Sequence, residues 1–71
     1  MVNLDSYEPV PLEILSSDLF DNLIENSLKK YKLDQYHIKN IYWLKQNQNI
    51  ILVSMENNEH KKFFVLLTLH Q

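Results

Sequence analysis

The fold is decided by two apolar runs near the end of the chain, Asn49-Ile50-Ile51-Leu52-Val53-Ser54-Met55 and Lys61-Lys62-Phe63-Phe64-Val65-Leu66-Leu67-Thr68-Leu69-His70. Both runs are rich in the β-branched, aliphatic and aromatic residues that favour strands. The connecting Glu56-Asn57-Asn58-Glu59 contains asparagines, which tolerate the positive φ of a tight turn in place of glycine. The pattern therefore predicts a β-hairpin formed by residues 49–55 and 61–70.

The predicted hairpin is apolar on both of its faces. Ile50-Ile51-Leu52-Val53 and Phe63-Phe64-Val65-Leu66-Leu67 carry large apolar side chains at consecutive positions, whereas a hairpin with one face in water alternates. We therefore expect a layer over each face. Since the chain offers only one or two helices to provide these layers, we also expect it to form a homodimer at micromolar concentrations.

A helix is predicted before the hairpin, from about Ser17 to Lys32. Ser17 or Asp18 is suited to cap the free amides at its start, and the lysines near its end suit the negative pole of the helix dipole. Leu12 to Leu15 is expected to form a separate turn after Pro11, because Ser16-Ser17 is typical of a new helix start. At about 100° per residue, the face of this helix that is turned to the core carries Phe20, Leu23, Ile24, Ser27, Leu28 and Tyr31.

Residues 34–47 fit two structures. As a strand, this segment places Tyr36, Ile38, Tyr42 and Leu44 on one face, interrupted by Asn40. As a helix capped by Asp34, it places Ile38, Ile41, Tyr42 and the stem of Lys45 on one face. The count of matching positions slightly favours the strand, and the periodicity alone leaves both structures open.

Composition limits the protein to one small domain. The 71 residues are 45% hydrophobic and 23% charged, which is typical of a folded chain. We expect a single domain over 1–71, with residues 1–10 as a flexible or packed N-terminal arm. The acidic N-terminal segment lacks the pattern of a secretory signal, and the longest apolar run, 63–69, is far shorter than a membrane span, so we expect a cytoplasmic protein with no membrane partner.

The opening of the chain resembles a known family. Val10-Pro11, Leu15-Ser16 and Asp21-Asn22-Leu23-Ile24-Glu25 are similar to the start of the small bacterial YheU-type family, and Leu44 followed by Ile50-Ile51-Leu52-Val53-Ser54 is similar to its later part. A glycine-containing loop of that family has no counterpart between Lys32 and Asp34. The resemblance implies an α+β fold of two helices followed by a β-hairpin in two layers, so we predict a helix at 34–47. The alternative is one helix on a three-stranded antiparallel meander. The family implies no function.

The residue types argue against an enzyme. The chain has no cysteine and no glycine, which removes thiolate metal sites, cysteine nucleophiles and the glycine-dependent phosphate loops and nucleophile elbows. None of the three histidines, His37, His60 and His70, stands in an i, i+4 pair with another histidine or a cysteine, and Asp34 with His37 is one pair where a metal site needs three or four ligands. Asp21 and Glu25 lie one turn apart on the polar helix face. We predict no catalytic residue, no metal and no cofactor.

Charge is distributed unevenly along the chain. Residues 1–26 contain six acids and no base, whereas residues 27–71 contain seven lysines and three acids, giving −6 and +4 and a net charge of −2. A nucleic-acid-associated protein that uses Lys39, Lys45, Lys61 and Lys62 is therefore the second hypothesis. Dedicated nucleic-acid binders usually have a clear positive balance, which makes nucleic acid the less favoured partner.

The favoured hypothesis is a small non-catalytic binding module, accessory subunit or inhibitor that contacts a protein through residues 34–47 or through a hairpin edge. Its partner is another protein or a second copy of the chain. In both structures considered for residues 34–47, Trp43 and Lys39 point away from the main apolar face, and tryptophan is frequent at binding hot spots. The alternative is that the N-terminal arm around Val10 and Leu12 covers Trp43. The predicted binding residues are Trp43, Lys39, Tyr36 and Asn40.

Overall fold

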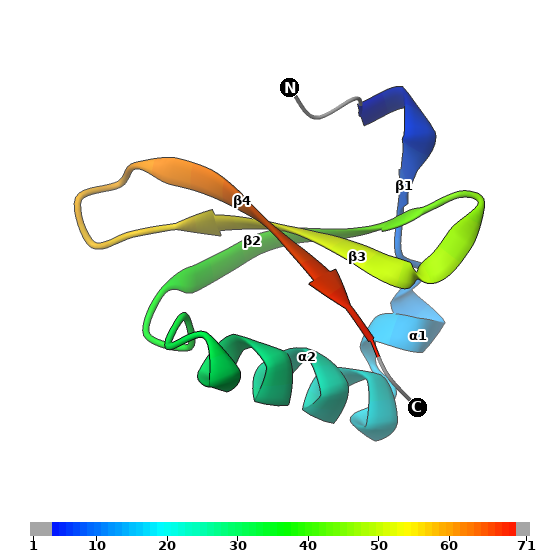
Figure 1. Cartoon of the computed structure of the whole chain (residues 1–71), viewed down its shortest axis with the longest axis horizontal. Coiled ribbons are helices and arrows are strands. Elements are labelled where there is room, and N and C mark those ends of the chain that lie inside the picture. Colours follow the sequence, from blue (N-terminus) through cyan, green and yellow to red (C-terminus); the bar gives the residue numbers. More distant parts are fainter. Residues whose placement is uncertain (1–3, 70–71) are drawn as a thin grey trace.

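A computed structural model describes residues 4–69 as a four-stranded antiparallel sheet with helices packed on one side (Figure 1). The α+β class is confirmed. The strand order in the sheet is the order along the chain. The elements are a 3-10 turn η1 (Leu4–Ser6), β1 (Tyr7–Pro9), α1 (Leu12–Leu15), α2 (Asp18–Lys30), β2 (His37–Leu44), β3 (Asn47–Glu56) and β4 (Lys62–Thr68).

The main helix, α2, forms where the apolar spacing predicts it. Phe20, Ile24 and Leu28 recur every fourth residue and are buried against the sheet. Acidic residues occupy its first turn and Lys29 and Lys30 its last, as the helix dipole favours. The short α1 is the separate turn expected before Ser16-Ser17. Within residues 4–69, no helix combines the length and apolar character needed to cross a membrane.

Helix α2 ends in a left-handed turn made without glycine. Lys32 has φ of 59°, the Lys32 amide donates to the Lys29 carbonyl at 3.0 Å, and the Leu33 amide donates to the Leu28 carbonyl at 2.8 Å. This pair of bonds is the Schellman motif, in which the left-handed position is usually glycine. Lys32 therefore holds a conformation that its Cβ disfavours.

The first face of the sheet, defined as the face covered by α2, contains the core. On this face, side chains of paired residues on neighbouring strands line up in rows across the sheet, and α2 and α1 pack over these rows. Ile51, Val53 and Met55 on β3 are fully buried at the centre. The rows are Trp43, Ile51 and Leu67; Ile41, Val53 and Val65; and Ile38, Met55 and Phe63.

The predicted helix at 34–47 is wrong, because residues 37–44 form strand β2. The three-stranded meander held as the alternative is present, and β1 extends it to four strands. A bulge at Lys39 interrupts the alternation: Ile38 pairs with Met55, and Asn40 pairs with the next residue, Ser54. The bulge therefore places Ile38 on the same face as Ile41, opposite to Tyr42, which a regular strand would not do.

The predicted hairpin is confirmed as β3 and β4, but its loop differs from the expected turn. His60, with φ of 64°, takes the left-handed conformation that was expected of an asparagine. Asn57 instead accepts hydrogen bonds through its side-chain oxygen from the amides of Glu59 at 2.8 Å and Lys61 at 3.0 Å.

Of the expected N-terminal arm, residues 7–9 form β1, whereas residues 1–3 lie outside the described residues, as does His70 at the other end of the chain.

Glycine at position 32 is predicted to stabilise the protein. Lys32→Gly removes the Cβ penalty of a left-handed residue, which outweighs the added chain entropy, so we expect the free energy of unfolding to rise by about 0.5–1 kcal/mol. Urea denaturation followed by circular dichroism measures this change. The same substitution inside the helix, Lys29→Gly, should lower stability by about 1 kcal/mol. A loss of stability in Lys32→Gly would contradict the strain assigned to this turn.

Candidate functional site

Trp43 belongs to the core, and the expectation that it lies outside the apolar face is wrong. Its side chain is 8% exposed, and its indole Nε1 donates a hydrogen bond to Glu8 Oε1 at 2.9 Å. The cause is the sheet register: Trp43 pairs with Ile51, which points to α2, and Glu8 of β1 lies beside it on the same face. A buried tryptophan needs such an acceptor for its N–H group.

The other three predicted binding residues do not form one surface with Trp43. Tyr36 packs against the core, with its ring edge-on to Phe63 at 5.5 Å between centroids. Lys39 is the bulge residue, and its Nζ lies 3.7 Å from Glu56 Oε2. Asn40 is exposed and pairs with Ser54, so it lies on the opposite side of the sheet from Trp43.

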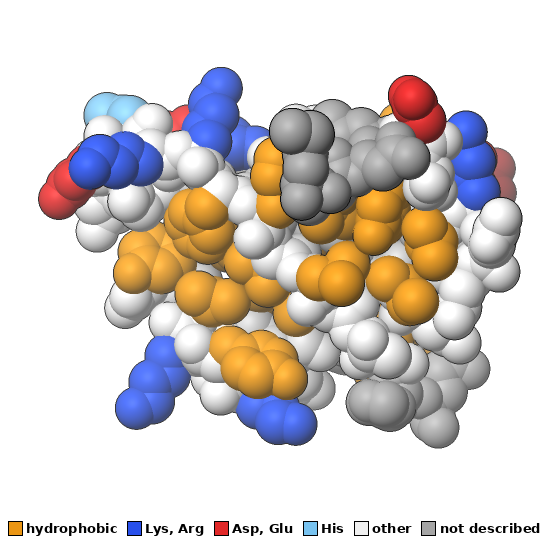
Figure 2. Space-filling model, turned by 45° about the horizontal axis from the view of Figure 1, so that its top comes forward, with side chains coloured by type: hydrophobic (Ala, Val, Ile, Leu, Met, Phe, Trp, Pro, Cys, Tyr) orange, Lys and Arg blue, Asp and Glu red, His pale blue; other side chains and the backbone are white. Residues whose placement is uncertain are grey.

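The structure instead presents an apolar surface on the side of the sheet away from α2, here called the second face. Both α-helices pack on the first face, and Figure 2 shows hydrophobic side chains gathered over the strands on this other side. Leu52 is 1% exposed at its centre, between Tyr42 on β2 and Leu66 on β4. Its apolar members are Tyr42, Leu44, Ile50, Leu52, Phe64 and Leu66.

Exposure on the second face rises toward β4. Tyr42, Leu44 and Ile50 are half-buried, whereas Phe64 is 48% and Leu66 is 60% exposed. Both residues belong to the outermost strand of the sheet. The most accessible apolar side chains of this face therefore lie at a sheet edge, where backbone groups are also available.

The backbone of β4 points alternately toward β3 and outward. The Leu69 amide donates to the Asn49 carbonyl at 2.8 Å, and the Lys61 carbonyl accepts from the Asn57 amide at 2.9 Å, so odd-numbered residues face β3. The even-numbered residues 62, 64, 66 and 68 consequently direct both N–H and C=O away from the sheet. Within residues 4–69, no hydrogen bond to these groups from another segment is present.

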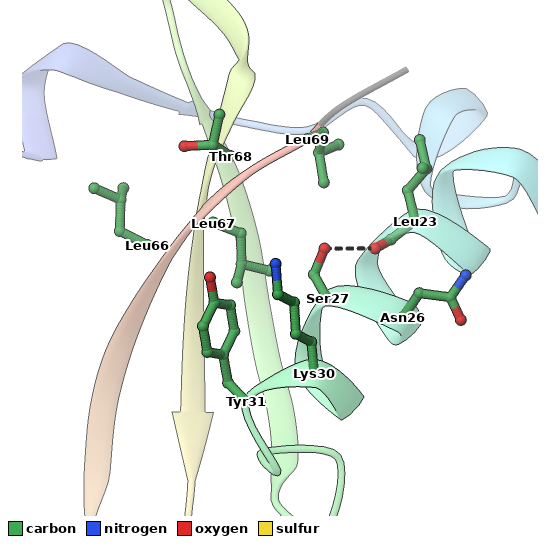
Figure 3. A pocket seen from close by; sticks show the side chains of 9 residues that line it. All are labelled: Leu23, Asn26, Ser27, Lys30, Tyr31, Leu66, Leu67, Thr68 and Leu69. Carbon is green, nitrogen blue, oxygen red and sulfur yellow. Dashed lines mark hydrogen bonds between the residues drawn. The ribbon is translucent and has the colours of Figure 1, made fainter.

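A groove runs beside this edge, between β4 and the last turns of α2. Figure 3 shows Lys30 and Tyr31 reaching from the helix toward the strand, with Leu66 and Thr68 on the strand side. The groove has a volume of about 490 Å³. Ser27 at its floor is already satisfied, because its Oγ donates to the Leu23 carbonyl at 2.8 Å. The groove lies beside residues 66 and 68, whose backbone N–H and C=O groups are directed away from the sheet.

Charged groups gather at the hairpin end of the sheet. His60 Nδ1 donates to Glu56 Oε1 at 2.9 Å, and Lys39 approaches the other carboxylate oxygen. The hydrogen bond from His60 lowers the pKa of Glu56; partial burial opposes this shift and the positive charge of Lys39 reinforces it. No group of three or more metal-ligating side chains occurs among the described residues.

Substitution of Trp43 is predicted to destabilise the fold. Because the side chain is buried, Trp43→Ala should lower the free energy of unfolding by about 3–5 kcal/mol, and the wild-type fluorescence should be blue-shifted and resistant to acrylamide. Urea denaturation followed by circular dichroism measures the stability. Leu12→Ala removes an apolar side chain that is 79% exposed, and it should change stability by less than about 0.5 kcal/mol. Equal effects of the two substitutions would place Trp43 at the surface.

Glu56 is predicted to contribute to stability in a pH-dependent manner. Because its pKa in the folded protein lies below the ordinary value of 4.5, its contribution is present above that pH and is lost as the pH falls through the lowered pKa. The difference in urea midpoint between wild type and Glu56→Gln should therefore be full above pH 4.5 and should shrink as the pH falls below that value. Glu59→Gln, which alters an exposed pair with Lys61, should show a smaller difference. A difference that stays constant with pH would contradict the assignment.

Comparison with known proteins adds no further assignment. The chain matches no family model, no curated protein and no solved structure. The resemblance to the YheU-type family stays a prediction. The features that bear on function are therefore the chain's own: the second face, the free edge of β4 and the groove beside it.

Proposed function

We propose that the protein is a small non-catalytic binding module that engages another polypeptide chain through β4. The observation that carries this proposal is the outward-facing backbone of β4 at residues 62, 64, 66 and 68, flanked by the exposed side chains of Phe64 and Leu66. A partner strand would add to the sheet at this edge. Its main-chain hydrogen bonds would supply affinity, and its side chains would contact the second face.

Two features of the edge support strand addition. The strand is seven residues long and contains no proline, so every outward position offers both a donor and an acceptor. The apolar side chains beside it continue inward to the buried Leu52, so a partner strand would extend an existing apolar row. Exposed apolar groups that adjoin a free edge are typical of surfaces that bind another chain.

The hypothesis of nucleic-acid binding receives less support from the lysines assigned to it. Lys39 lies 3.7 Å from a Glu56 oxygen, and Lys61 Nζ lies 3.6 Å from Glu59 Oε2. Phosphate binding depends on cations that are free to replace counterions. Acidic neighbours offset two of the four lysines, so a protein partner remains the favoured proposal.

Site-specific photocrosslinking tests the proposed function. A benzoylphenylalanine side chain in place of Phe64 should crosslink to polypeptide on irradiation in a lysate of the source cell. The additional substitution Leu66→Asp should remove the products, because it introduces a charge into the apolar contact. Mass spectrometry identifies what is attached.

The control places the same photoreactive side chain at Asn22, on the exposed side of α2. Products from position 64 should exceed those from position 22 and should survive nuclease treatment. Equal yields at the two positions would overturn the proposal. Products that disappear with nuclease would favour the nucleic-acid hypothesis instead.

A further inference from the structure

The two edges of the sheet differ in how well they are protected. The edge strand β1 has three residues and includes Pro9, which has no amide hydrogen to donate. The edge strand β4 has seven residues, no proline and an unbroken register with β3 over its whole length. Sheet edges are usually protected from pairing with another chain by short strands, proline, bulges or charges. On β4, the charge of Lys62 at the first position is the one such feature.

We propose that the occupant of the β4 edge is a second copy of the chain, whose own β4 pairs with it in the antiparallel direction about a two-fold axis at Val65. This inference rests on the proposed function and names its partner. It joins two four-stranded sheets into one continuous sheet. The remaining free edges of the pair are both β1, so the assembly closes at two copies, as an isologous contact requires.

The axis at Val65 follows from the backbone. Hydrogen-bonded pairs across the new contact must join outward-facing residues, which are the even-numbered ones. With the axis at Val65, Phe64 lies opposite Leu66 of the second copy, and Lys62 lies opposite Thr68 of the second copy. All four outward residues then find a partner that can exchange two hydrogen bonds. An axis at Phe64 or at Leu66 leaves one outward residue of each copy without a partner.

The side chains are also self-complementary in this register. On the second face, Phe64 and Leu66 of the two copies would form one apolar cluster that continues into the buried Leu52 of each sheet. Aromatic and aliphatic cross-strand pairs of this kind are favourable. The register sets no lysine opposite another lysine, because the residue that faces Lys62 is a threonine. A contact made mainly by one short strand is small, so we expect a dissociation constant in the micromolar range.

The groove between α2 and β4 leaves space for the incoming strand. Tyr31, which is 60% exposed, and Lys30 line it on the helix side, and Leu66 and Thr68 line it on the strand side. An edge covered directly by the helix would have no such access. The helix therefore packs under the first face and leaves the β4 backbone free to pair.

Sedimentation equilibrium between about 1 and 500 µM tests the dimer, since that range spans micromolar dissociation constants. The wild-type chain should show a reversible equilibrium between monomer and dimer. Leu66→Lys should weaken dimerisation about ten-fold or more, as expected for a central contact. Leu12→Lys makes the same substitution at a residue that is 79% exposed on α1 and should leave dimerisation unchanged. A wild-type chain that stays monomeric throughout, or an equal effect of the two substitutions, would overturn the dimer.

Disulfide trapping tests the register, and the absence of native cysteine makes it selective. Val65→Cys should crosslink to itself, because antiparallel residues at the axis approach to roughly 4.5 Å between Cα atoms. Phe64→Cys alone and Leu66→Cys alone should not, because two positions along a strand add roughly 7 Å to their separation. A mixture of these two variants should crosslink. Efficient self-crosslinking of Phe64→Cys would overturn the axis at Val65.

The two proposals fail in different ways. If the chain is monomeric and position 64 still crosslinks to another protein, the second copy is wrong and the binding function stands. If the chain dimerises and Leu66→Lys has no effect, the dimer uses another surface. If neither the dimer nor the crosslinks at position 64 appear, both proposals are wrong. Circular dichroism of each variant confirms folding before these comparisons.

Discussion

The packing of one amphipathic helix on one side of the sheet determines the rest of the structure. Phe20, Ile24 and Leu28 of α2 cover the rows of side chains that meet at Ile51 and Val53. Strand β3 is apolar at consecutive positions, so its side chains need cover on both sides. The 71 residues form one long helix, which is enough to cover one side of the sheet. The other side becomes the second face, with Leu52 buried among neighbouring side chains and Leu66 exposed.

A local irregularity in β2 decides on which side of the sheet Ile38 lies. The bulge at Lys39 puts Ile38 and Ile41 on the same side of the sheet, and Trp43 follows Ile41 in regular alternation. The same bulge brings the Lys39 ammonium to the carboxylate of Glu56, across the hydrogen-bonded strands. One extra residue therefore sets the side of the sheet on which Ile38 lies, although that side chain is still 43% exposed, and it supplies an ion pair to the hairpin end.

The sequence predicted the elements whose periodicity was unambiguous. Helix α2 and the β3–β4 hairpin followed from apolar spacing and strand-forming residues, whereas the expected capping is not seen, because Ser17 at the start of α2 makes no side-chain capping hydrogen bond. A hairpin edge was among the surfaces expected to bind a partner. Residues 34–47 fit both the helical and the strand period, and pairing with β3 in the folded protein selects the strand. Alternation correctly set Trp43 opposite Tyr42 and Leu44, but the bulge has no signature in residue type and moved Ile38 to the side of Ile41 and Trp43, so the side that α2 covers was not predictable from alternation. Strand β1 was missed because three residues ending in Pro9 carry no periodic signal.

The residues at the free edge are not those that folding alone requires. Phe64 and Leu66 are about half exposed, so little of their hydrophobic stabilisation is realised within one copy of the chain. Threonine or lysine would satisfy the same strand positions and would protect the edge from unwanted pairing. At Val65 and Leu67, by contrast, apolar side chains are needed, because those positions face α2 and the core. The apolar side chains of β4 that face the core stabilise the fold, whereas those on its other side contribute little to the stability of one copy. This is the composition expected of an edge strand that pairs with a strand from outside the domain.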